Sequence, residues 1–288
     1  MNSDCTCSGY CAPRRREGRE GARRFFGQVP LFADPRVLRA FAVRFCFCFF
    51  AAGCPKPQII AGPPVDAVAL YAQVEAAHRS PETLSCKAYA IVDAPDNGGR
   101  SPLLLSVKRP ASLRIEVLTP LGDPVAVLVA DQGRFALLDL RNNLFHRGPA
   151  TPRNLSRVMA TPLTADELVS LLTGAIPPLP EGVPLSARRD GDGYLLALAA
   201  PGAVQWVALG ADLRVLSVRR TSEGGAPIWE VSLDEHDDAL LPRVLHLEAA
   251  TAKTKVDLRL RSVVKGSPPP PGAFILAAPP GMRVEDVE

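Results

Sequence analysis

The sequence predicts a mainly β (α+β) fold, an incomplete antiparallel β-barrel of about 11–12 strands with an N-terminal helix and a mid-chain helical lid. Three observations lead to this prediction. Short apolar runs of strand length recur on both sides of the middle of the chain. The breaks between them are short and rich in turn residues, which favours antiparallel neighbours. Helical patterns occur only before the first run and between the two groups of runs. A sheet of this many strands tends to curl.

The first element is a predicted helix that starts near Val65 and ends near His78, before Ser80-Pro81. Its apolar residues recur near the helical period and form one mainly apolar stripe. The stripe comprises Val65, Val68, Ala69, Ala72, Val74 and Ala76. We expect this stripe to pack against the sheet.

The strand-like runs differ in how many of their faces are apolar. In "KVDLRLRSVV", Val256, Leu258 and Leu260 alternate with charged residues, which is typical of a sheet with one wet face. In "PVAVLVA", Val125, Val127 and Val129 share one face and Ala126, Leu128 and Ala130 the other. That strand should be covered twice, by the lid helices on one side and by a ligand or a neighbouring strand on the other. Ordinary core on both sides is the alternative. The turns "DNGG" and "RNN" supply residues that tolerate positive φ.

The mid-chain pattern predicts two short helices, "TPRNLSRVMA" and "TADELVSLLTG". Thr164 is placed as an N-cap, and Glu167 three residues later completes a capping box. Gly174 is placed to end the second helix. We expect "AIPPLPEGVP" to be a loop, and the chain to close with a proline spacer, a short edge strand and a tail.

An apolar block, "FCFCFFAAGC", lies near the N-terminus and is too short to span a membrane, which takes roughly 20 apolar residues. Its length, the preceding Arg44 and the small residues that follow it are typical of a signal peptide. The stretch Ala51-Ala52-Gly53-Cys54 resembles a bacterial lipobox. The resemblance implies that Cys54 becomes the first mature residue and carries a thioether-linked diacylglycerol and an N-acyl chain. A short buried strand or helix is the alternative.

Charge divides the chain at the same point. Residues 1–53 hold nine Arg, no Lys and four acids, whereas the remainder has 24 basic and 26 acidic residues. The net charge of +3 therefore belongs to the leader, and nothing favours nucleic acid as a partner of the rest. The leader exceeds a signal peptide of about 15–30 residues, so we expect translation to start further downstream. We divide the chain into 1–53, leader and signal peptide; 54–63, a flexible tether; and 64–288, one domain.

No catalytic or metal-binding motif stands out, so we expect neither an enzyme nor a bound cofactor. The four His are scattered, and "HDD" at 236–238 is predicted to be a polar turn. "RDGDG" at 189–193 lacks the later ligands of a calcium loop and is predicted to be a hairpin turn. Five of the seven Cys precede Cys54, so Cys86 should be a buried thiol without a disulfide partner.

Two segments then resemble a known family. "LRIEVLTPLGDPVAVLVADQGRFALLD" and "MATPLTADELVSLLTG" are similar to the LolA/LolB-type periplasmic lipoprotein carriers, most closely to the outer-membrane receptor LolB. The similarity extends over residues 64–280 and is concentrated in 110–175. It implies an incomplete antiparallel barrel with a helical lid and an apolar cavity for acyl chains. It also implies that Leu121, in the Pro-Leu-Gly turn, protrudes and helps to transfer acyl chains.

The function that this resemblance implies is a lipid-anchored carrier or receptor in lipoprotein localisation to the outer membrane. Its partners would be lipoproteins or other acylated amphiphiles, and it would be a monomer held to the membrane by Cys54, facing the periplasm. Pro55, where an aspartate would favour the inner membrane, points to the outer membrane. The alternative is a non-carrier assembly or scaffold lipoprotein with the same fold. A cavity of several hundred Å³ would favour the carrier, and a filled barrel the scaffold.

Overall fold

The computed structural model describes residues 62–77, 81–95, 98–159, 161–250 and 252–288. All of them belong to one compact unit, residues 57–288. Every element and the whole buried core of the described residues lie in this unit, so it is the part of the chain used in the experiments below. The predicted lipid attachment site, Cys54, and the predicted leader lie outside the described residues.

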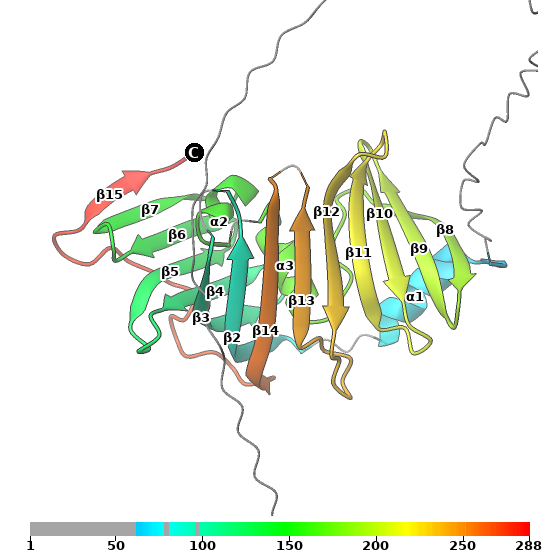
Figure 1. The fold of residues 1–288 in the computed structure, drawn as a ribbon, viewed down its shortest axis with the longest axis horizontal. Helices are drawn as coiled ribbons and strands as arrows, with labels where there is room; N and C mark the ends of the chain where they lie inside the picture. The colour runs from blue at the N-terminus through cyan, green and yellow to red at the C-terminus, as the bar shows by residue number, and fades with distance from the viewer. Residues whose placement is uncertain (1–61, 78–80, 96–97, 160, 251) are drawn as a thin grey trace, which may run out of the picture. The chain divides into compact units, whose positions relative to one another are not determined.

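Fifteen strands form a single open sheet (Figure 1). Neighbours are antiparallel except for the last strand, which runs parallel to its partner. In chain order the strands are β1 (Pro64–Val65), β2 (Thr83–Asp93), β3 (Gly99–Lys108), β4 (Ser112–Leu118), β5 (Pro124–Asp131), β6 (Arg134–Asp139), β7 (Leu144–Pro149), β8 (Val183–Asp190), β9 (Gly193–Ala200), β10 (Ala203–Leu209), β11 (Val215–Ser222), β12 (Pro227–Asp234), β13 (Val244–Ala249), β14 (Thr254–Lys265) and β15 (Arg283–Asp286). Their spatial order is β1-β8-β9-β10-β11-β12-β13-β14-β2-β3-β4-β5-β6-β7-β15. The incomplete antiparallel barrel is thereby confirmed, with more strands than predicted.

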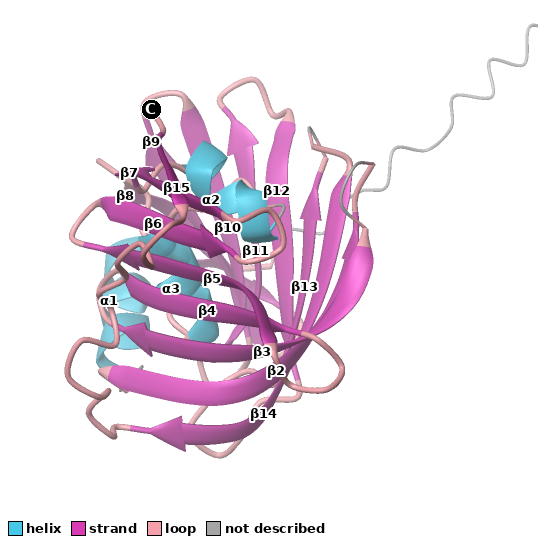
Figure 2. Ribbon diagram, turned by 90° about the vertical axis from the view of Figure 1, so that its left-hand side faces the viewer, coloured by secondary structure: helices cyan, strands magenta, loops and turns pink. Residues whose placement is uncertain are grey.

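Three helices occur in the described residues: α1 (Ala67–Ala77), α2 (Pro152–Met159) and α3 (Ala165–Leu172). α1 contacts β8 and β9, while α2 contacts β5 and α3 contacts β4. The sheet curls around α2 and α3, which we call the lid helices (Figure 2). None of these helices is both long and apolar enough to span a membrane.

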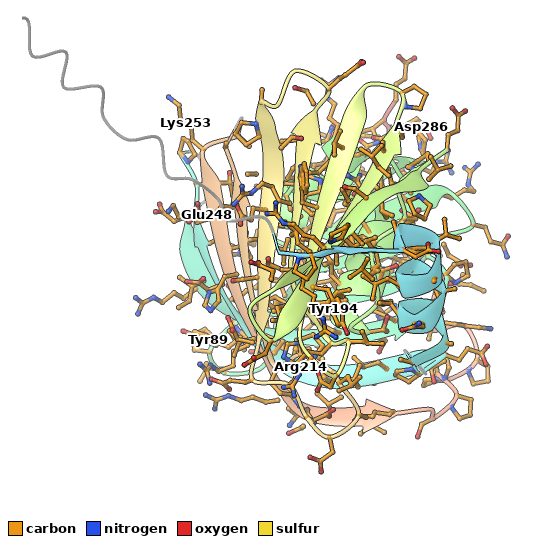
Figure 3. The ribbon with its side chains drawn as sticks, turned by 90° about the vertical axis from the view of Figure 1, so that its right-hand side faces the viewer. Tyr89, Tyr194, Arg214, Glu248, Lys253 and Asp286 are labelled. Atoms are coloured by element: carbon orange, nitrogen blue, oxygen red, sulfur yellow. The ribbon has the colours of Figure 1, made fainter. Side chains whose placement is uncertain are left out.

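The sheet has an inner face, toward the helices, and an outer face. On β2, Ala88 and Ala90 point inward and are buried, whereas Tyr89 points outward and is 40% exposed. Figure 3 shows Tyr89 and Glu248 at the outer side, away from α1. The alternation predicted for β14 is confirmed, because Val256, Leu258 and Leu260 are buried and the residues between them are exposed.

β5 is covered on both faces, as predicted. Leu128 and Ala130 join the core beneath the helices. Val127 and Val129 are buried on the outer face, where the C-terminal segment 273–278 lies beside Val129 and Phe145. The second cover is thus a later part of the same chain. This segment directly follows the proline spacer and is not itself a strand; the edge strand of the C-terminal region is β15, which lies further on and pairs with β7.

The turns follow from local chemistry. Gln132 and Gly133 both have positive φ between β5 and β6, which suits the twist of a two-residue hairpin. Asn143, in the predicted turn "RNN", has φ +54°. Asp190 pairs with Gly193 across the β8–β9 hairpin, so "RDGDG" is a hairpin turn as predicted.

Two expectations were wrong. The sequence did not indicate β8, because its Pro, Ser, Arg and Asp residues read as a loop; it is a strand near the sheet's edge, where such residues are tolerated. The predicted apolar stripe of α1 is its buried face only at Val74. The other buried residue of α1 is Leu70, which lies outside the stripe, while Val68 is 64% exposed. This helix is apolar on most sides, so its periodicity could not select the contact face.

Candidate functional site

The candidate site is a cavity of about 250 Å³ on the inner face of the sheet. Four adjacent strands, β14, β2, β3 and β4, form its wall. Val92 lies opposite Val256 and Ala90 opposite Leu258 in the β2–β14 pairing, so these side chains meet across the wall. The lid helix α2 contributes Val158 and Arg157, and the β6–β7 turn contributes Arg141. The remaining lining residues are Gly98, Gly99, Ser101, Leu103, Ile115 and Val117. The wall is therefore largely apolar, as an acyl chain requires.

Beside the main cavity, α3 packs closely against the inner face. A second space of about 30 Å³ lies between Leu168 and Leu171 of this helix and the strands, and it shares Val256 and Leu258 with the main cavity. It is about the size of one water molecule. The main cavity itself falls just below the roughly 300–1,000 Å³ typical of ligand pockets. In this conformation the inner face holds neither an empty barrel nor a solid core.

Local chemistry fixes both ends of α3. Thr164 N–H donates to Glu167 Oε2 at 2.8 Å, and Glu167 N–H donates to Thr164 Oγ1, so the predicted capping box is confirmed. At the other end Gly174 has φ +76°. Ala175 N–H then donates to Ser170 O and Gly174 N–H to Leu171 O, which completes a Schellman motif. The helix is short and defined at each end.

A buried polar network ties α3 to the sheet. Glu167 forms an ion pair with Arg220 of β11, and their side chains are 5% and 10% exposed. Arg220 also donates to Gln205 Oε1 and to Pro178 O, and Gln205 Nε2 donates to Pro177 O. The Arg220 guanidinium lies 4.8 Å from the centre of the Trp229 ring. We call Glu167, Arg220, Gln205 and Trp229 the latch, because they hold this lid helix against β10, β11 and β12.

The sequence did not identify the latch. Glu167 was assigned only to the capping box, and it performs that role with one oxygen while the other meets Arg220. Arg220 lies 53 residues further on and reads as an ordinary polar strand residue. Nothing in the local pattern of either residue indicated their pairing.

Leu121 lies at the tip of the β4–β5 turn and has 92% of its surface exposed. The turn closes through its own hydrogen bonds, from Thr119 N–H to Asp123 O and from Gly122 N–H to Thr119 O. Leu121 is not among the residues that line the cavity. The structure thus does not bring together Leu121 and the cavity wall.

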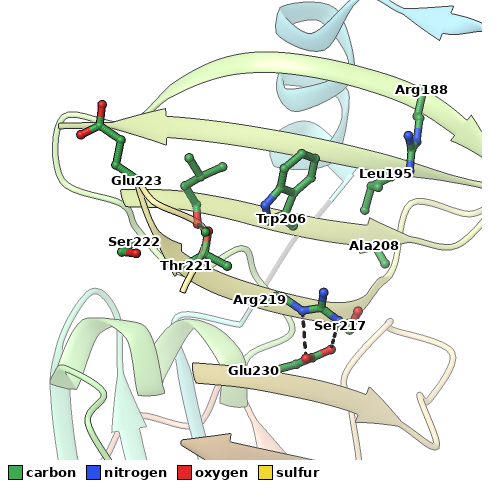
Figure 4. Close-up of a pocket in the computed structure, with 12 residues that line it drawn as sticks. Arg188, Leu195, Trp206, Ala208, Ser217, Arg219, Thr221, Ser222, Glu223 and Glu230 are labelled. Carbon is green, nitrogen blue, oxygen red and sulfur yellow. Dashed lines mark hydrogen bonds and ion pairs between the residues drawn. The ribbon is translucent and has the colours of Figure 1, made fainter. Parts of the chain in front are cut away.

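A larger groove, of about 620 Å³, lies on the outer face of β8–β12 (Figure 4). Leu195, Trp206 and Ala208 lie along it, and Arg219 and Glu230 form an exposed ion pair at its side. Unlike the inner cavity, it has no lid helix among its lining residues, so it offers an acyl chain cover from one side only. It serves below as a control position.

The titratable groups of the described residues serve local turns and the core. Within the described part of the chain, no three His, Cys, Asp or Glu residues lie close enough to hold a metal ion. In the turn at 236–238, Asp237 accepts from backbone N–H groups and from Arg243 and Lys265. Burial lowers the pKa of His236, whose Nε2 lies 2.9 Å from Val215 O. Cys86 is buried, as predicted.

Solved structures with a similar fold are known. No protein-family model matches the chain, and no curated protein sequence matches it. Among solved structures, an outer membrane lipoprotein-sorting protein domain from Vibrio parahaemolyticus aligns over 73% of this chain and 96% of its own, with 12% identity and a TM-score of 0.54. A LolA superfamily protein from Nitrosomonas europaea covers 74% and 98%, with 13% identity and a TM-score of 0.52. A DUF1329 family protein from Desulfovibrio piger covers 73% and 98%, with 9% identity and a TM-score of 0.54.

These likenesses extend over nearly the full length of each solved chain and about three quarters of this one. At such low identities they establish the fold and not the site residues. The curled antiparallel sheet with its lid helices is therefore similar in fold to the LolA superfamily protein from Nitrosomonas europaea and to the lipoprotein-sorting protein domain from Vibrio parahaemolyticus.

Proposed function

We propose that this protein is a lipid-anchored envelope protein that binds acyl chains in its inner cavity. It would act as a carrier or receptor in lipoprotein localisation to the outer membrane, anchored through lipid on Cys54 and facing the periplasm. The observation that carries the proposal is the apolar cavity beneath α2, which four strands line from one side. The fold shared with a lipoprotein-sorting domain supports the choice of cargo.

Burial of hydrocarbon supplies the binding energy. Each CH₂ group removed from water contributes about 0.8 kcal/mol. A cavity of about 250 Å³ holds only part of a long acyl chain, so a full chain requires a lid helix to move. A tight latch and a small resting cavity suit a protein that takes up its cargo and later releases it.

The test is a chain-length series of neutral alcohols, from hexan-1-ol to dodecan-1-ol, titrated into residues 57–288 by calorimetry. We expect the affinity to rise about fourfold per added CH₂ until the cavity is full. Ala90→Phe places a ring in the cavity and should abolish binding, whereas Ala208→Phe, in the outer groove, should leave it unchanged. Thermal unfolding must show that both variants fold. No binding by the parent protein, or equal binding by Ala90→Phe, would count against a carrier.

The anchor needs a separate experiment on the full chain in a Gram-negative host. The parent protein should fractionate with the outer membrane, and mass spectrometry should find its mature N-terminus at an acylated Cys54. Cys54→Ser should remove the acyl groups. A mature product that starts well upstream of Cys54 and lacks acylation would remove the anchor from the proposal.

A scaffold remains the second candidate, because Leu168 and Leu171 of α3 leave a space of only about 30 Å³ between this helix and the strands. Mass spectrometry of lipids that co-purify with the protein separates the two. A carrier should retain acyl lipids that Ala90→Phe loses, whereas a scaffold should retain none.

A further inference from the structure

Two arginines lie on the lining of the inner cavity, among mostly apolar side chains. Arg141 comes from the β6–β7 turn and Arg157 from the last turn of α2. Both are exposed at the surface of the protein, so they lie where the cavity opens to solvent. Neither side chain forms a hydrogen bond or ion pair with any residue that the structure describes, and the only other polar side chain of the lining is Ser101.

The surroundings of Arg141 leave its guanidinium available. Its nearest carboxylate along the chain is Asp139, whose Oδ1 accepts from the backbone N–H groups of Arg141 and Asn142. Asp139 Oδ2 accepts from Asn142 Nδ2 at 2.8 Å. The Asp139 carboxylate thus stabilises the turn, and the turn fixes the position of the Arg141 backbone.

Arg157 has an alternative explanation, since a cation in the last turn of a helix is favoured by the helix dipole. That explanation does not extend to Arg141, which belongs to a different element. Two separate segments each place a cation at the same cavity. A shared role at that cavity explains both positions more simply than two unrelated causes. Guanidinium groups suit carboxylate and phosphate because their N–H donors match two oxygens at once.

We propose that the inner cavity prefers amphiphiles whose single acyl chain ends in an anionic head group, a carboxylate or a phosphate monoester. The chain lies against Ala90, Val92, Val256 and Leu258, and the head group meets Arg141 and Arg157. This inference rests on the proposed function, because it uses the same cavity. It goes further by assigning a charge to the head group of the ligand, which the burial of an acyl chain does not specify.

The experiment compares three ligands of equal chain length by calorimetry on residues 57–288: decanoate, decyl phosphate and decan-1-ol. We expect each anion to bind about tenfold more tightly than the alcohol, as for one hydrogen bond to a charged group. Arg141→Gln and Arg157→Gln should each weaken the anions several-fold without affecting decan-1-ol. The preference should shrink at high salt because both arginines are exposed. The tighter of the two anions identifies the head group.

Arg188→Gln is the matched control, because Arg188 lines the outer groove instead. It should change none of the affinities. Equal binding of all three ligands would overturn the inference and leave the proposed function standing. An effect of Arg188→Gln as large as that of the two cavity variants would also overturn it, since binding would then reflect general surface charge. Failure of decan-1-ol and both anions to bind would defeat the proposed function itself.

Discussion

Leu121 is the most exposed large apolar side chain of the described residues, and no structural role accounts for it. Thr119 and Asp123 close its turn without it: Thr119 N–H donates to Asp123 O at 2.8 Å, and Asp123 N–H donates to Thr119 Oγ1 at 3.1 Å. We therefore predict that Leu121→Glu changes the free energy of unfolding by less than about 0.5 kcal/mol. It should at the same time impair delivery of lipoproteins to the membrane. Urea denaturation and a lipoprotein transfer assay measure the two effects.

Ile275→Glu is the control for Leu121→Glu, because Ile275 is also highly exposed but lies in the C-terminal segment. It should leave transfer unchanged. If both variants reduce transfer equally, general surface hydrophobicity explains the result and Leu121 has no specific role.

Cys86 is the only cysteine of residues 57–288, and it is buried on the inner face of β2. Burial raises its pKa to about 12, against a smaller lowering by the charge of Arg243. A pH of 8 is about four units below that pKa, so at pH 8 about one molecule in ten thousand carries the reactive thiolate. We predict no reaction with a disulfide reagent in the native protein and one thiol per chain in urea. Fast labelling of the folded protein would contradict the buried position.

The raised pKa of Cys86 also makes the free energy of unfolding depend on pH. The usual pKa of the thiol is 9.0, so the unfolded state ionises first as the pH rises. The contribution of the buried Cys86 thiol to the free energy of unfolding is therefore complete below pH 9 and is lost as the pH rises from 9 to 12.

α3 ends at Gly174, where two independent constraints exclude a side chain. Its φ is +76°, and an added Cβ would lie 2.8 Å from the carbonyl oxygen of Leu240. Gly133 has nearly the same φ, +74°, but its Cβ would meet nothing within 4 Å. We predict that Gly133→Ala costs about 1–2 kcal/mol from backbone strain, and that Gly174→Ala costs more. Equal losses in urea denaturation would mean that the contact with Leu240 O relaxes freely.

The latch ties α3 to the sheet through a buried ion pair. Glu167→Gln keeps an acceptor for the capping box but leaves Arg220 buried without a counter-charge, which we predict costs about 3–5 kcal/mol of unfolding free energy. Arg219→Met is the matched control on the neighbouring residue of β11. It removes an ion pair with Glu230 whose side chains are 55% and 45% exposed, so the loss should be below about 1 kcal/mol. Similar losses for both would contradict the assigned role of the latch.

At the scale of the whole domain, the first and last strands of the chain form the two edges of the open sheet. β1 pairs with β8 at one edge, and β15 pairs with β7 at the other. Unpaired edges invite association with other strands. The C-terminal segment adds a second layer over the outer face of β5 and β7, tied by a hydrogen bond from Arg114 Nη1 to Ala273 O at 3.2 Å.

Deleting residues 273–288 should therefore expose Val129, Phe145 and the edge of β7 together. Each buried apolar side chain contributes about 1.5–3 kcal/mol, so we predict a loss of several kcal/mol. The shortened domain should also bind a hydrophobic dye and self-associate, which light scattering measures. Unchanged stability and no dye binding would mean that the segment does not cover these residues.

Much of the fold could be predicted because its information is local. The capping box of Thr164 and Glu167, the Gly174 helix end and the alternation of β14 depend only on residues a few positions apart. β8 was missed for the opposite reason: its polar composition is acceptable for a strand only near the edge of a sheet, and position in the sheet is not a local property.

The helices, nearly all the strands, the turns and the apolar character of both faces of β5 could be predicted from the sequence, because side-chain period and turn chemistry act between near neighbours. Local sequence did not specify the size of the cavity, the buried face of α1, the pairing of Glu167 with Arg220, or the presence of both Arg141 and Arg157 on the cavity lining. Each of these depends on how far the sheet curls and on which distant segments it brings together. Curvature is the sum of small twists over many strands, and no single stretch of sequence specifies that sum.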